Sequence, residues 1–245
     1  MTGSSAAPSP PTGLPDASVS SSALVQTRRA RRRKRSPGAR LFAHDRDLGV
    51  RFVAGADEAG RGCLAGPLVA AGVLFDLEKL TLADRRALSA LTDSKQLSIE
   101  VREEMYPRIM RIATRVSVTS RCSRGIDARG LHVTNLAALS DCLRRVAVPG
   151  CLCLSDGFPV PPTGFDQRPL VGGDRTSAAI AAASVIAKVT RDRFMQRAAE
   201  RYPQWEFETH VGYSTPEHRA AIELHGVSPL HRLSFQSVAY SQLAL

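Results

Sequence analysis

The chain has 245 residues, a hydrophobic fraction of 43% and a formal net charge of +10. That length suffices for one α/β domain with a full core, or for two small domains. No apolar run approaches the roughly 20 residues that span a bilayer, so the sequence argues against a membrane-spanning protein and we expect a soluble one.

Residues 1–45 are predicted to be a disordered basic tail, and residues 46–245 to form the folded domain. The first 27 residues are rich in Ser, Pro, Ala and Thr, which bury too little apolar surface to offset the entropy of ordering. Residues 1–40 hold eight basic residues and one acid, so only three of the ten surplus charges remain for the rest. The run Arg28–Arg35 predicts an arm with salt-sensitive affinity for polyphosphate. A basic, Ser-rich start also resembles an organellar transit peptide, which stays open as an alternative.

The chain contains five cysteines, an odd number with no Cys-x-x-Cys pair. This pattern argues against a disulfide framework and against a structural zinc site. A reducing cytoplasm is therefore the simplest location, and nothing in the sequence demands more than a monomer.

Strand-like and helix-like segments alternate from residue 52 onward. Strands joined by a turn as short as 60–66 are expected to be antiparallel. The alternation predicts one α/β domain with a helical C-terminal end and no internal repeats. In chain order, we expect strands at 52–56, 68–75, 115–119, 151–154 and 169–171, and helices at 82–91, 99–113, 135–146 and 178–201.

Four carboxylates follow predicted strands: Asp57 and Glu58 after the first, Asp156 after the fourth, and Asp174 after the fifth. Open α/β sheets place their chemistry beyond the carboxyl ends of strands, so neighbouring strands would bring the four side chains to one edge. Magnesium and manganese prefer carboxylate oxygens and often bridge them to substrate phosphates. Asp is also an ordinary turn residue, which is the alternative explanation for each position taken singly.

The segment Gly60-Arg61-Gly62 places a planar cation between two flexible backbone positions, directly after the first carboxylate pair. Such a segment suits an anion that the main chain must approach closely. Lys95, near the start of a helix, and Tyr213, a loop aromatic, are further candidates for contacts with phosphate and with sugar or base. The plain alternatives are a surface loop, simple N-capping around Ser98 and a half-buried structural tyrosine.

The helix predicted at 178–201 offers a polar stripe. Ser184, Lys188 and Arg191 lie at positions i, i+4 and i+7, which share one helix face. They could present a hydroxyl and two cations to a phosphate. Asp192 beside them could form an ion pair with a nearby basic side chain. A solvated helix end is the alternative.

Four histidines occur late in the chain, without the His-Glu-x-x-His spacing of a zinc site. We expect them to pack or to support a site from behind, not to bind a metal. They are His210, His218, His225 and His231.

Taken together, these motifs resemble bacterial ribonuclease HII. The resemblance covers about residues 52–235, and so many ordered blocks are far more specific than any one of them. The blocks are Asp57-Glu58-Ala59-Gly60-Arg61-Gly62, Leu64-Ala65-Gly66-Pro67, Asp93-Ser94-Lys95-Gln96-Leu97-Ser98, Asp156-Gly157, Gly173-Asp174, the stretch 181–192, Gly212-Tyr213, His218, His231-Arg232 and Ser234-Phe235.

The resemblance implies an α/β ribonuclease H-like fold, with a central mixed β-sheet flanked by helices and a helical C-terminal extension. It implies an endoribonuclease that hydrolyses the RNA strand of RNA/DNA hybrids. Such an enzyme also incises 5′ of ribonucleotides embedded in duplex DNA, leaving 3′-OH and 5′-phosphate ends.

Residue roles follow from the same resemblance. In the family, four carboxylates hold two divalent metals, Mg²⁺ or Mn²⁺, and the matching positions are Asp57, Glu58, Asp156 and Asp174. The Gly-Arg-Gly segment contacts the 2′-hydroxyl at the RNA–DNA junction, and a tyrosine stacks on the adjacent deoxyribose. The matching positions are Gly60, Arg61, Gly62 and Tyr213.

Two departures from the family pattern concern cations. The family usually has Lys before Gly-Asp and before Gly-Tyr, where this chain has Gly172 and Val211. The metal chemistry is expected to survive, while substrate affinity is in doubt and the Arg28–Arg35 arm is expected to compensate in part. A catalytically weak hybrid-binding protein is therefore the alternative function. A structural nucleoid protein would explain the arm but none of the motifs.

Overall fold

A single mixed sheet of five strands forms the centre of the protein in the computed structural model, which describes residues 35–235. The strand order is β3-β2-β1-β4-β5. The central strand β1 pairs antiparallel with β2 and parallel with β4, which confirms the predicted mixed sheet and the predicted antiparallel first pair. The strands are β1 (Phe52–Ala59), β2 (Leu68–Asp76), β3 (Arg115–Arg121), β4 (Cys151–Asp156) and β5 (Asp166–Leu170).

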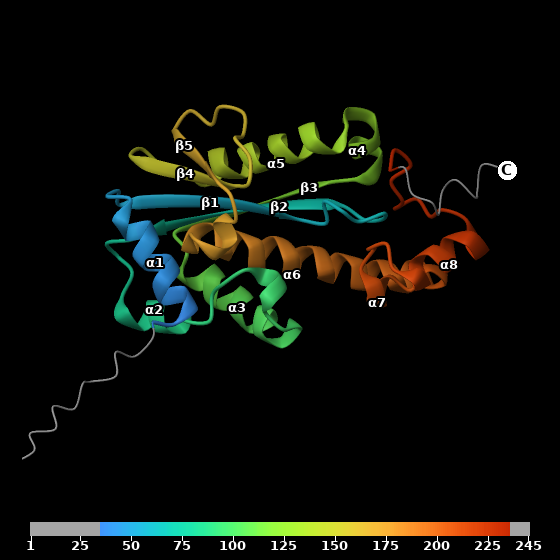
Figure 1. The fold of residues 1–245 in the computed structure, drawn as a ribbon, viewed down its shortest axis with the longest axis horizontal. Coiled ribbons are helices and arrows are strands. Elements are labelled where there is room, and N and C mark those ends of the chain that lie inside the picture. The colour runs from blue at the N-terminus through green and yellow to red at the C-terminus, as the bar shows by residue number, and fades with distance from the viewer. Residues whose placement is uncertain (1–34, 236–245) are drawn as a thin grey trace, which may run out of the picture. The chain divides into compact units, whose positions relative to one another are not determined.

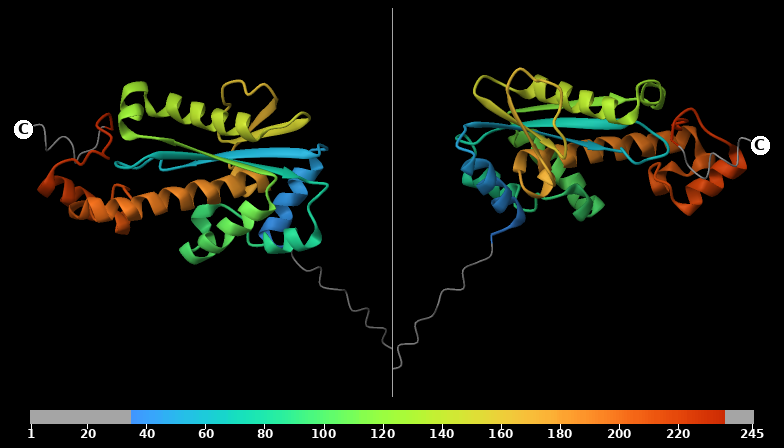
Figure 2. Two further views of the ribbon diagram at one scale, coloured as in Figure 1. Left: turned by 180° about the vertical axis from the view of Figure 1, so that it is seen from behind. Right: turned by 45° about the horizontal axis from the view of Figure 1, so that its top comes forward.

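Helices cover both faces of this sheet. Figures 1 and 2 show α5 on one face, and α6 with α1 and α3 on the other. The helices are α1 (Pro37–Asp47), α2 (Leu82–Ala87), α3 (Ile99–Ile112), α4 (Ser123–Arg129), α5 (Leu131–Val146), α6 (Ala178–Arg201), α7 (Phe207–His210) and α8 (Pro216–His225), with 3-10 turns at Ser94–Gln96, Gly173–Arg175 and Pro203–Trp205.

The long helix α6 lies unusually close to the central strand. A Cβ atom at Gly55 would lie only 2.2 Å from the backbone of Ala179, so only glycine allows this approach. The facing segment 178–183 of α6 is entirely Ala or Ile and fully buried. This contact aligns the middle of α6, with Ser184 and Lys188, alongside the end of β1.

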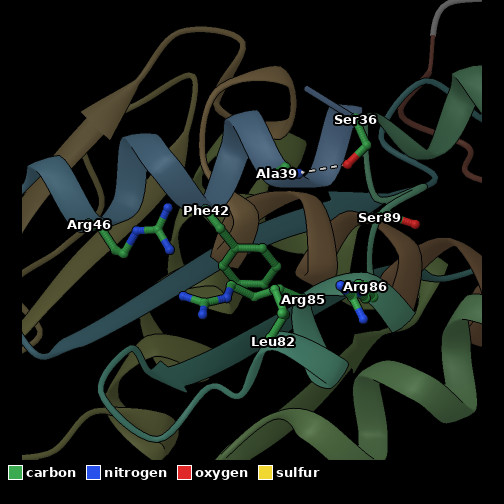
Figure 3. A pocket seen from close by; sticks show the side chains of 8 residues that line it. All are labelled: Ser36, Ala39, Phe42, Arg46, Leu82, Arg85, Arg86 and Ser89. Atoms are coloured by element: carbon green, nitrogen blue, oxygen red, sulfur yellow. Dashed lines mark hydrogen bonds between the residues drawn. The ribbon is translucent and has the colours of Figure 1, made fainter. Parts of the chain in front are cut away.

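Residues 37–47 form a helix, so the expected tail boundary at residue 45 is wrong. The Ser36 hydroxyl caps α1 by accepting a hydrogen bond from the amide of Ala39, and Phe42 projects between α1 and α2 (Figure 3). Phe42 is 1% exposed and packs edge-on against Phe75 of β2. Two buried apolar side chains, Leu41 and Phe42, anchor the helix, although an arginine-rich run precedes it in the sequence. The rest of the predicted tail, residues 1–34, lies outside the described residues.

Other boundaries differ in ways that matter for the site. Strand β1 continues through Asp57 and Glu58 to Ala59, because this part of β1 still pairs with β2. The two carboxylates therefore lie within a strand and not after one, and Asp156 is likewise the last residue of β4. The helix expected at 82–91 ends at Ala87, and α4 was not expected. No helix in residues 35–235 combines the length and apolar character needed to cross a membrane.

Candidate active site

A pocket of about 290 Å³ opens beyond the end of β1. It gathers most of the residues predicted to bind metal or substrate, from segments far apart in the chain. Asp174 does not line it but lies next to it, since the amide of Gly173 donates a 2.7 Å hydrogen bond to Oδ1 of Asp156. The lining residues are Asp57, Glu58, Ala59, Gly60, Arg61, Gly62, Ser94, Lys95, Asp156, Ser184, Lys188 and Tyr213.

Asp57 and Glu58 are consecutive strand residues, so their side chains leave opposite faces of the sheet. Asp57 turns to the α6 face, where the Ser184 hydroxyl stabilises its charge, and Glu58 turns to the α5 face, where Asn135 does so. Burial raises the pKa of Asp57 well above its usual value, and the charges of Glu58 and Asp156 raise it further. Burial also raises the pKa of Glu58, although Asn135 and Arg61 oppose the rise. Both carboxylates are therefore held where negative charge is unfavourable.

Asp174 lies in the 3-10 turn after β5 and is 7% exposed. Burial raises its pKa to about 6, with further contributions from the charges of Asp93 and Asp156. Its nearest cation is Arg175, whose Nε lies 3.8 Å from Oδ1. Asp57, Glu58, Asp156 and Asp174, hereafter the carboxylate site, thus share one electrostatic environment.

Two neighbours of the carboxylate site escaped the sequence analysis as site residues. Asp93 caps the turn Ser94–Gln96 and faces Asp174, and Asn135 is a buried residue of α5 that faces Glu58. Neither follows a strand, so the pattern that pointed to the four carboxylates could not find them. Ser94 was quoted only as part of a motif, and its hydroxyl lies 2.7 Å from that of Ser184.

The polar stripe on α6 divides into two parts. Ser184 and Lys188 line the pocket, and Lys188 forms a 2.8 Å ion pair with Asp192, as the sequence suggested for that aspartate. Nζ of Lys188 also lies 5.4 Å from the ring centre of Tyr213. Arg191 is fully buried and donates its hydrogen bonds to main-chain carbonyl groups, so the prediction that it faces a phosphate is wrong.

The loop 60–62 lies at the mouth of the pocket, and Arg61 is its exposed cation. The guanidinium lies 5.0 Å from the ring centre of Phe158 and 3.9 Å from Oε1 of Glu58. Gly60 has φ of +86°, a conformation that favours glycine. The side chain of Arg61 is 38% exposed, so its donors remain accessible to a ligand.

The histidines form a chain of neutral rings behind Tyr213. Nδ1 of His218 lies 2.8 Å from the carbonyl oxygen of Tyr213 and must donate to it, so Nε2 accepts from Nε2 of His231 at 3.1 Å. Nδ1 of His231 in turn accepts from the amide of Ser228. Burial lowers the pKa of His218 and of His231 to about 4. This confirms the expected packing role for His218 and His231, whereas His225 is exposed and contacts the edge of the fold at the ring of Trp205.

His210 and Arg232 complete the support of these loops. Nδ1 of His210 accepts from the amide of Gly212, and its Nε2 faces the carbonyl of Trp205. Arg232 is fully buried and donates to the carbonyls of Arg61 and Gly66. We call Arg191, His210, His218, His231 and Arg232 the loop clamp.

The two positions that depart from the family pattern both have left-handed backbone. Gly172 has φ of +64°, and a Cβ atom there would lie 3.6 Å from the guanidinium of Arg175. Val211 has φ of +43°, which is strained for a β-branched residue. The positive charge next to Asp174 therefore comes from Arg175, one residue after the carboxylate, and not from a lysine at position 172.

A second pocket, of about 350 Å³, lies between α1 and α2 (Figure 3). Arg46, Arg85 and Arg86 surround it, and Phe42 forms part of its wall. No carboxylate lines it, so its chemistry is the reverse of that of the carboxylate site and it cannot hold a metal cation.

Comparison with known protein families shows one clear match. The family model described as Ribonuclease HII matches residues 54–238. Proteins named Ribonuclease HII from Rhizobium johnstonii and Geobacillus kaustophilus are 46% and 42% identical to this chain. The first alignment covers 82% of this chain and 84% of the relative, and the second covers 81% and 74%.

Solved structures show the same similarity in three dimensions. Ribonuclease H2 from Pyrococcus horikoshii aligns with a TM-score of 0.66 at 26% identity, over 79% of this chain and 98% of that one. The RNase HII in a complex with PCNA from Archaeoglobus fulgidus aligns with a TM-score of 0.64 at 27% identity, over 76% and 96%. A Bst-RNase HIII structure in complex with Mn²⁺ shares the fold at 22% identity and a TM-score of 0.63, over 85% and 73%. These matches confirm the predicted ribonuclease H-like fold.

Proposed function

The chain belongs to the ribonuclease HII family, and we propose on that premise that its carboxylate site binds the divalent cations with which it incises duplex DNA 5′ of an embedded ribonucleotide. The protein is an endoribonuclease that hydrolyses the RNA strand of RNA/DNA hybrids, as its family membership shows. The observation that carries the proposal is the crowding of buried carboxylates beside the loop 60–62 and Tyr213 in one pocket.

The donor set of the carboxylate site fits a hard divalent cation. All four groups are carboxylates, the ligands that Mg²⁺ and Mn²⁺ prefer. Mutual repulsion and burial raise the pKa values of Asp57, Glu58 and Asp174, which is the electrostatic condition that a bound cation relieves. No three potential ligands in residues 35–235 are close enough to hold a metal ion as they stand.

A divalent cation supplies the activation of an attacking water and the stabilisation of a leaving oxygen in phosphodiester hydrolysis. The protein's own residues orient the substrate. Lys188 and Lys95 line the pocket and are placed to attract the phosphate backbone, and the Ser184 hydroxyl favours the charged form of Asp57, against the larger effects of burial and like charges. Mn²⁺ or Mg²⁺ both suit the site, and the Mn²⁺ complex of the Bst-RNase HIII supports Mn²⁺ as one of them.

Ribonucleotide recognition is assigned to the two loops at the pocket mouth. The main chain of Gly60, Arg61 and Gly62 would contact the 2′-hydroxyl, which is the group that distinguishes RNA from DNA at one position. Tyr213 is 37% exposed at the pocket, which leaves its ring free to stack on the adjacent deoxyribose. This arrangement favours RNA–DNA junctions over uniform RNA.

Other cations offset the loss of substrate affinity that is expected from Gly172 and Val211. Arg175 stands next to Asp174, and the run Arg28–Arg35 precedes α1. Because α1 begins at Pro37, deletion of residues 2–34 removes every basic residue of the run except Arg35 without cutting into the folded domain. We expect this deletion to weaken hybrid binding, most strongly at low salt. An unchanged dissociation constant at low salt would exclude a role for the run.

A catalytically weak hybrid-binding protein is the second candidate function, favoured only by the absence of lysine at positions 172 and 211. All four carboxylates are present. Their burial and mutual repulsion destabilise the folded protein, and a protein that only binds hybrids would gain nothing from them. The two functions differ in whether the carboxylates are required for a product.

The test is cleavage of a DNA duplex that carries one ribonucleotide, with Mg²⁺, with Mn²⁺ and with chelator. We expect a metal-dependent cut on the 5′ side of the ribonucleotide, with 3′-OH and 5′-phosphate ends. A duplex of the same sequence without the ribonucleotide is the control. Cleavage of long hybrids alone would overturn the junction assignment, and binding without cleavage in either metal would favour the second candidate.

A further inference from the structure

Arg191 is a charged side chain with no exposed surface, placed on α6 directly behind the two recognition loops. Its guanidinium donates three hydrogen bonds: Nε to the carbonyl of Pro67 at 2.9 Å, Nη2 to that of Ala65 at 2.9 Å, and Nη1 to that of Val211 at 2.8 Å. Two of these carbonyls follow the loop 60–62, and the third precedes Gly212-Tyr213. One rigid, planar group therefore spans both loops.

The loops are also bonded directly to each other at the same place. The carbonyl oxygen of Gly212 accepts from the amides of Leu64, at 2.9 Å, and Ala65, at 3.3 Å. The ring of Tyr213 lies over the guanidinium, with 5.8 Å between Cζ of Arg191 and the ring centre. The position of Tyr213 relative to the loop 60–62 is thus set through Arg191 and through backbone that Arg191 holds.

Three glycines leave the space that this arrangement needs. A Cβ atom on Gly60 would lie 2.0 Å from Nε of Arg191, and one on Gly66 would lie 3.1 Å from Nη2. On Gly212, a Cβ atom would lie 2.3 Å from the carbonyl oxygen of Ala65. All three glycines have positive φ, so both their conformation and their size suit close packing around the guanidinium.

Arg191 holds Val211, one of two residues other than glycine with positive φ in the described part of the chain. Val211 has φ of +43°, a conformation that is strained for a β-branched residue. Such strain persists only where the surroundings impose it. The hydrogen bond from Nη1 to the Val211 carbonyl, together with the packing of Gly212 on Ala65, imposes it here. The strain sits directly before the residue proposed to stack on the substrate.

We propose that Arg191 is a positioning residue for ribonucleotide recognition: it fixes the spacing between the loop 60–62 and Tyr213, so that both engage adjacent nucleotides of one junction. This inference rests on the roles proposed above for those two loops. Lysine keeps the charge but cannot donate in three fixed directions, so Arg191→Lys is the informative change.

The role makes a prediction that differs between substrates. A single embedded ribonucleotide offers one 2′-hydroxyl, so loops at the wrong spacing find no productive register. A long RNA/DNA hybrid offers a 2′-hydroxyl at each RNA nucleotide, and displaced loops still find one. Small misplacements cost up to about a hundredfold in rate, so we expect Arg191→Lys to lower kcat/KM for the single-ribonucleotide duplex about tenfold more than for the hybrid.

The experiment measures kcat/KM on both substrates for the wild type, Arg191→Lys and the matched control Arg197→Lys, an exposed arginine of the same helix. A general loss of structure lowers both values equally, so the ratio is the decisive readout. In addition, the effect of Tyr213→Ala should shrink when Arg191 is already Lys, because coupled residues are not additive. An unchanged ratio with additive effects would overturn the proposal.

A folding defect can be separated from the positioning role. If Arg191→Lys does not fold, Arg191→Ala is assayed with and without free guanidinium ion at millimolar concentration, which can restore the missing group. Recovery of the substrate ratio supports the proposal, and a protein that stays unfolded with guanidinium makes Arg191 a folding residue only. The wild type separates the two levels of inference. If it fails to cut 5′ of the single ribonucleotide, the proposed function fails, whereas a normal wild type with an unchanged ratio in the variant overturns only the role of Arg191.

Discussion

The carboxylate site and the loop clamp both bury charged or polar groups, but in opposite ways. In the carboxylate site, burial and like charges raise the pKa values of Asp57, Glu58 and Asp174. In the loop clamp, the guanidinium of Arg191 faces three carbonyl oxygens, and the histidines are neutral rings with hydrogen-bond partners on both nitrogens. The first region is electrostatically unsatisfied and the second is satisfied.

The difference separates binding from support. Buried polar groups that are fully hydrogen-bonded give a unique and rigid arrangement. Buried like charges are retained where a ligand will neutralise them, and they destabilise the protein until it does. The clamp therefore orders the recognition loops before substrate arrives, and the carboxylate site stays poised for cations.

The largest expected effect concerns chemistry at the carboxylate site. Asp156→Asn removes the charge that influences Asp57, Glu58 and Asp174 alike, so we expect cleavage to fall about a thousandfold or more. Hybrid binding should change by less than about threefold, since the recognition loops are untouched. Cleavage assays and a binding titration check both values, with exposed Asp166→Asn as control. Substantial cleavage by Asp156→Asn would remove the distinction between the two regions.

The next effect tests whether the clamp depends on neutral histidines. The pKa of His231 is about 4 in the folded protein and ordinarily 6.5, so the unfolded state binds more protons between these values and stability falls as the pH falls. Relative to the non-titrating variant His231→Gln, the wild type should lose about 1.4 kcal/mol of unfolding free energy per pH unit in this window. Subtracting the unfolding free energy of His231→Gln from that of the wild type cancels the pH dependence of the carboxylates, which has the opposite sign. A difference that does not vary with pH would contradict a neutral clamp.

Metal binding should stabilise the folded protein through the carboxylate site. A cation that binds only the folded state at a hundred times its dissociation constant stabilises by about 2.7 kcal/mol. We expect Mn²⁺ to raise the unfolding free energy of the wild type by about this amount, and Asp174→Asn to lose most of the gain. Denaturant titrations with Mn²⁺ and with chelator measure this gain in unfolding free energy. The control Asp166→Asn should show the same gain as the wild type. Equal gains in all three proteins would place the metal elsewhere.

The smallest expected effect concerns a neighbour of the carboxylates. The Ser184 hydroxyl favours the charged form of Asp57 and lies 2.7 Å from the Ser94 hydroxyl. Groups of this kind tune metal affinity by about tenfold, which is about 1.4 kcal/mol. Ser184→Ala should therefore need about tenfold more metal for half-maximal cleavage, and exposed Ser120→Ala should need no more. No shift in the metal requirement would confine Ser184 to packing.

Local sequence signals predicted the parts of the protein that local interactions determine. The helix at 178–201 matches α6, because an alanine-rich run follows a capping residue, Ser177. Helix α1 was missed because it has few apolar residues and adjoins an arginine-rich tail, yet Leu41 and Phe42 suffice to anchor it. Its stability comes from contacts with segments distant in the chain, which composition does not reveal.

The candidate site shows the same limit. Carboxylates near strand ends were found because strand ends converge, whereas Asp93 and Asn135 reach the site from a turn and a helix. Helix spacing correctly placed Arg191 beside Lys188. It could not show that the guanidinium would turn toward Ala65, Pro67 and Val211, since those carbonyls come from two loops folded against α6.

We propose that the carboxylate site holds unfavourable charge, which bound cations neutralise. Its most direct test is the free energy of unfolding of Asp57→Asn in chelator at about pH 7, compared with the wild type. We expect the variant to be the more stable protein, because it removes a buried charge that the charges of Glu58 and Asp156 disfavour. A variant less stable than the wild type would mean that the Asp57 charge is satisfied within the fold, and would contradict the account.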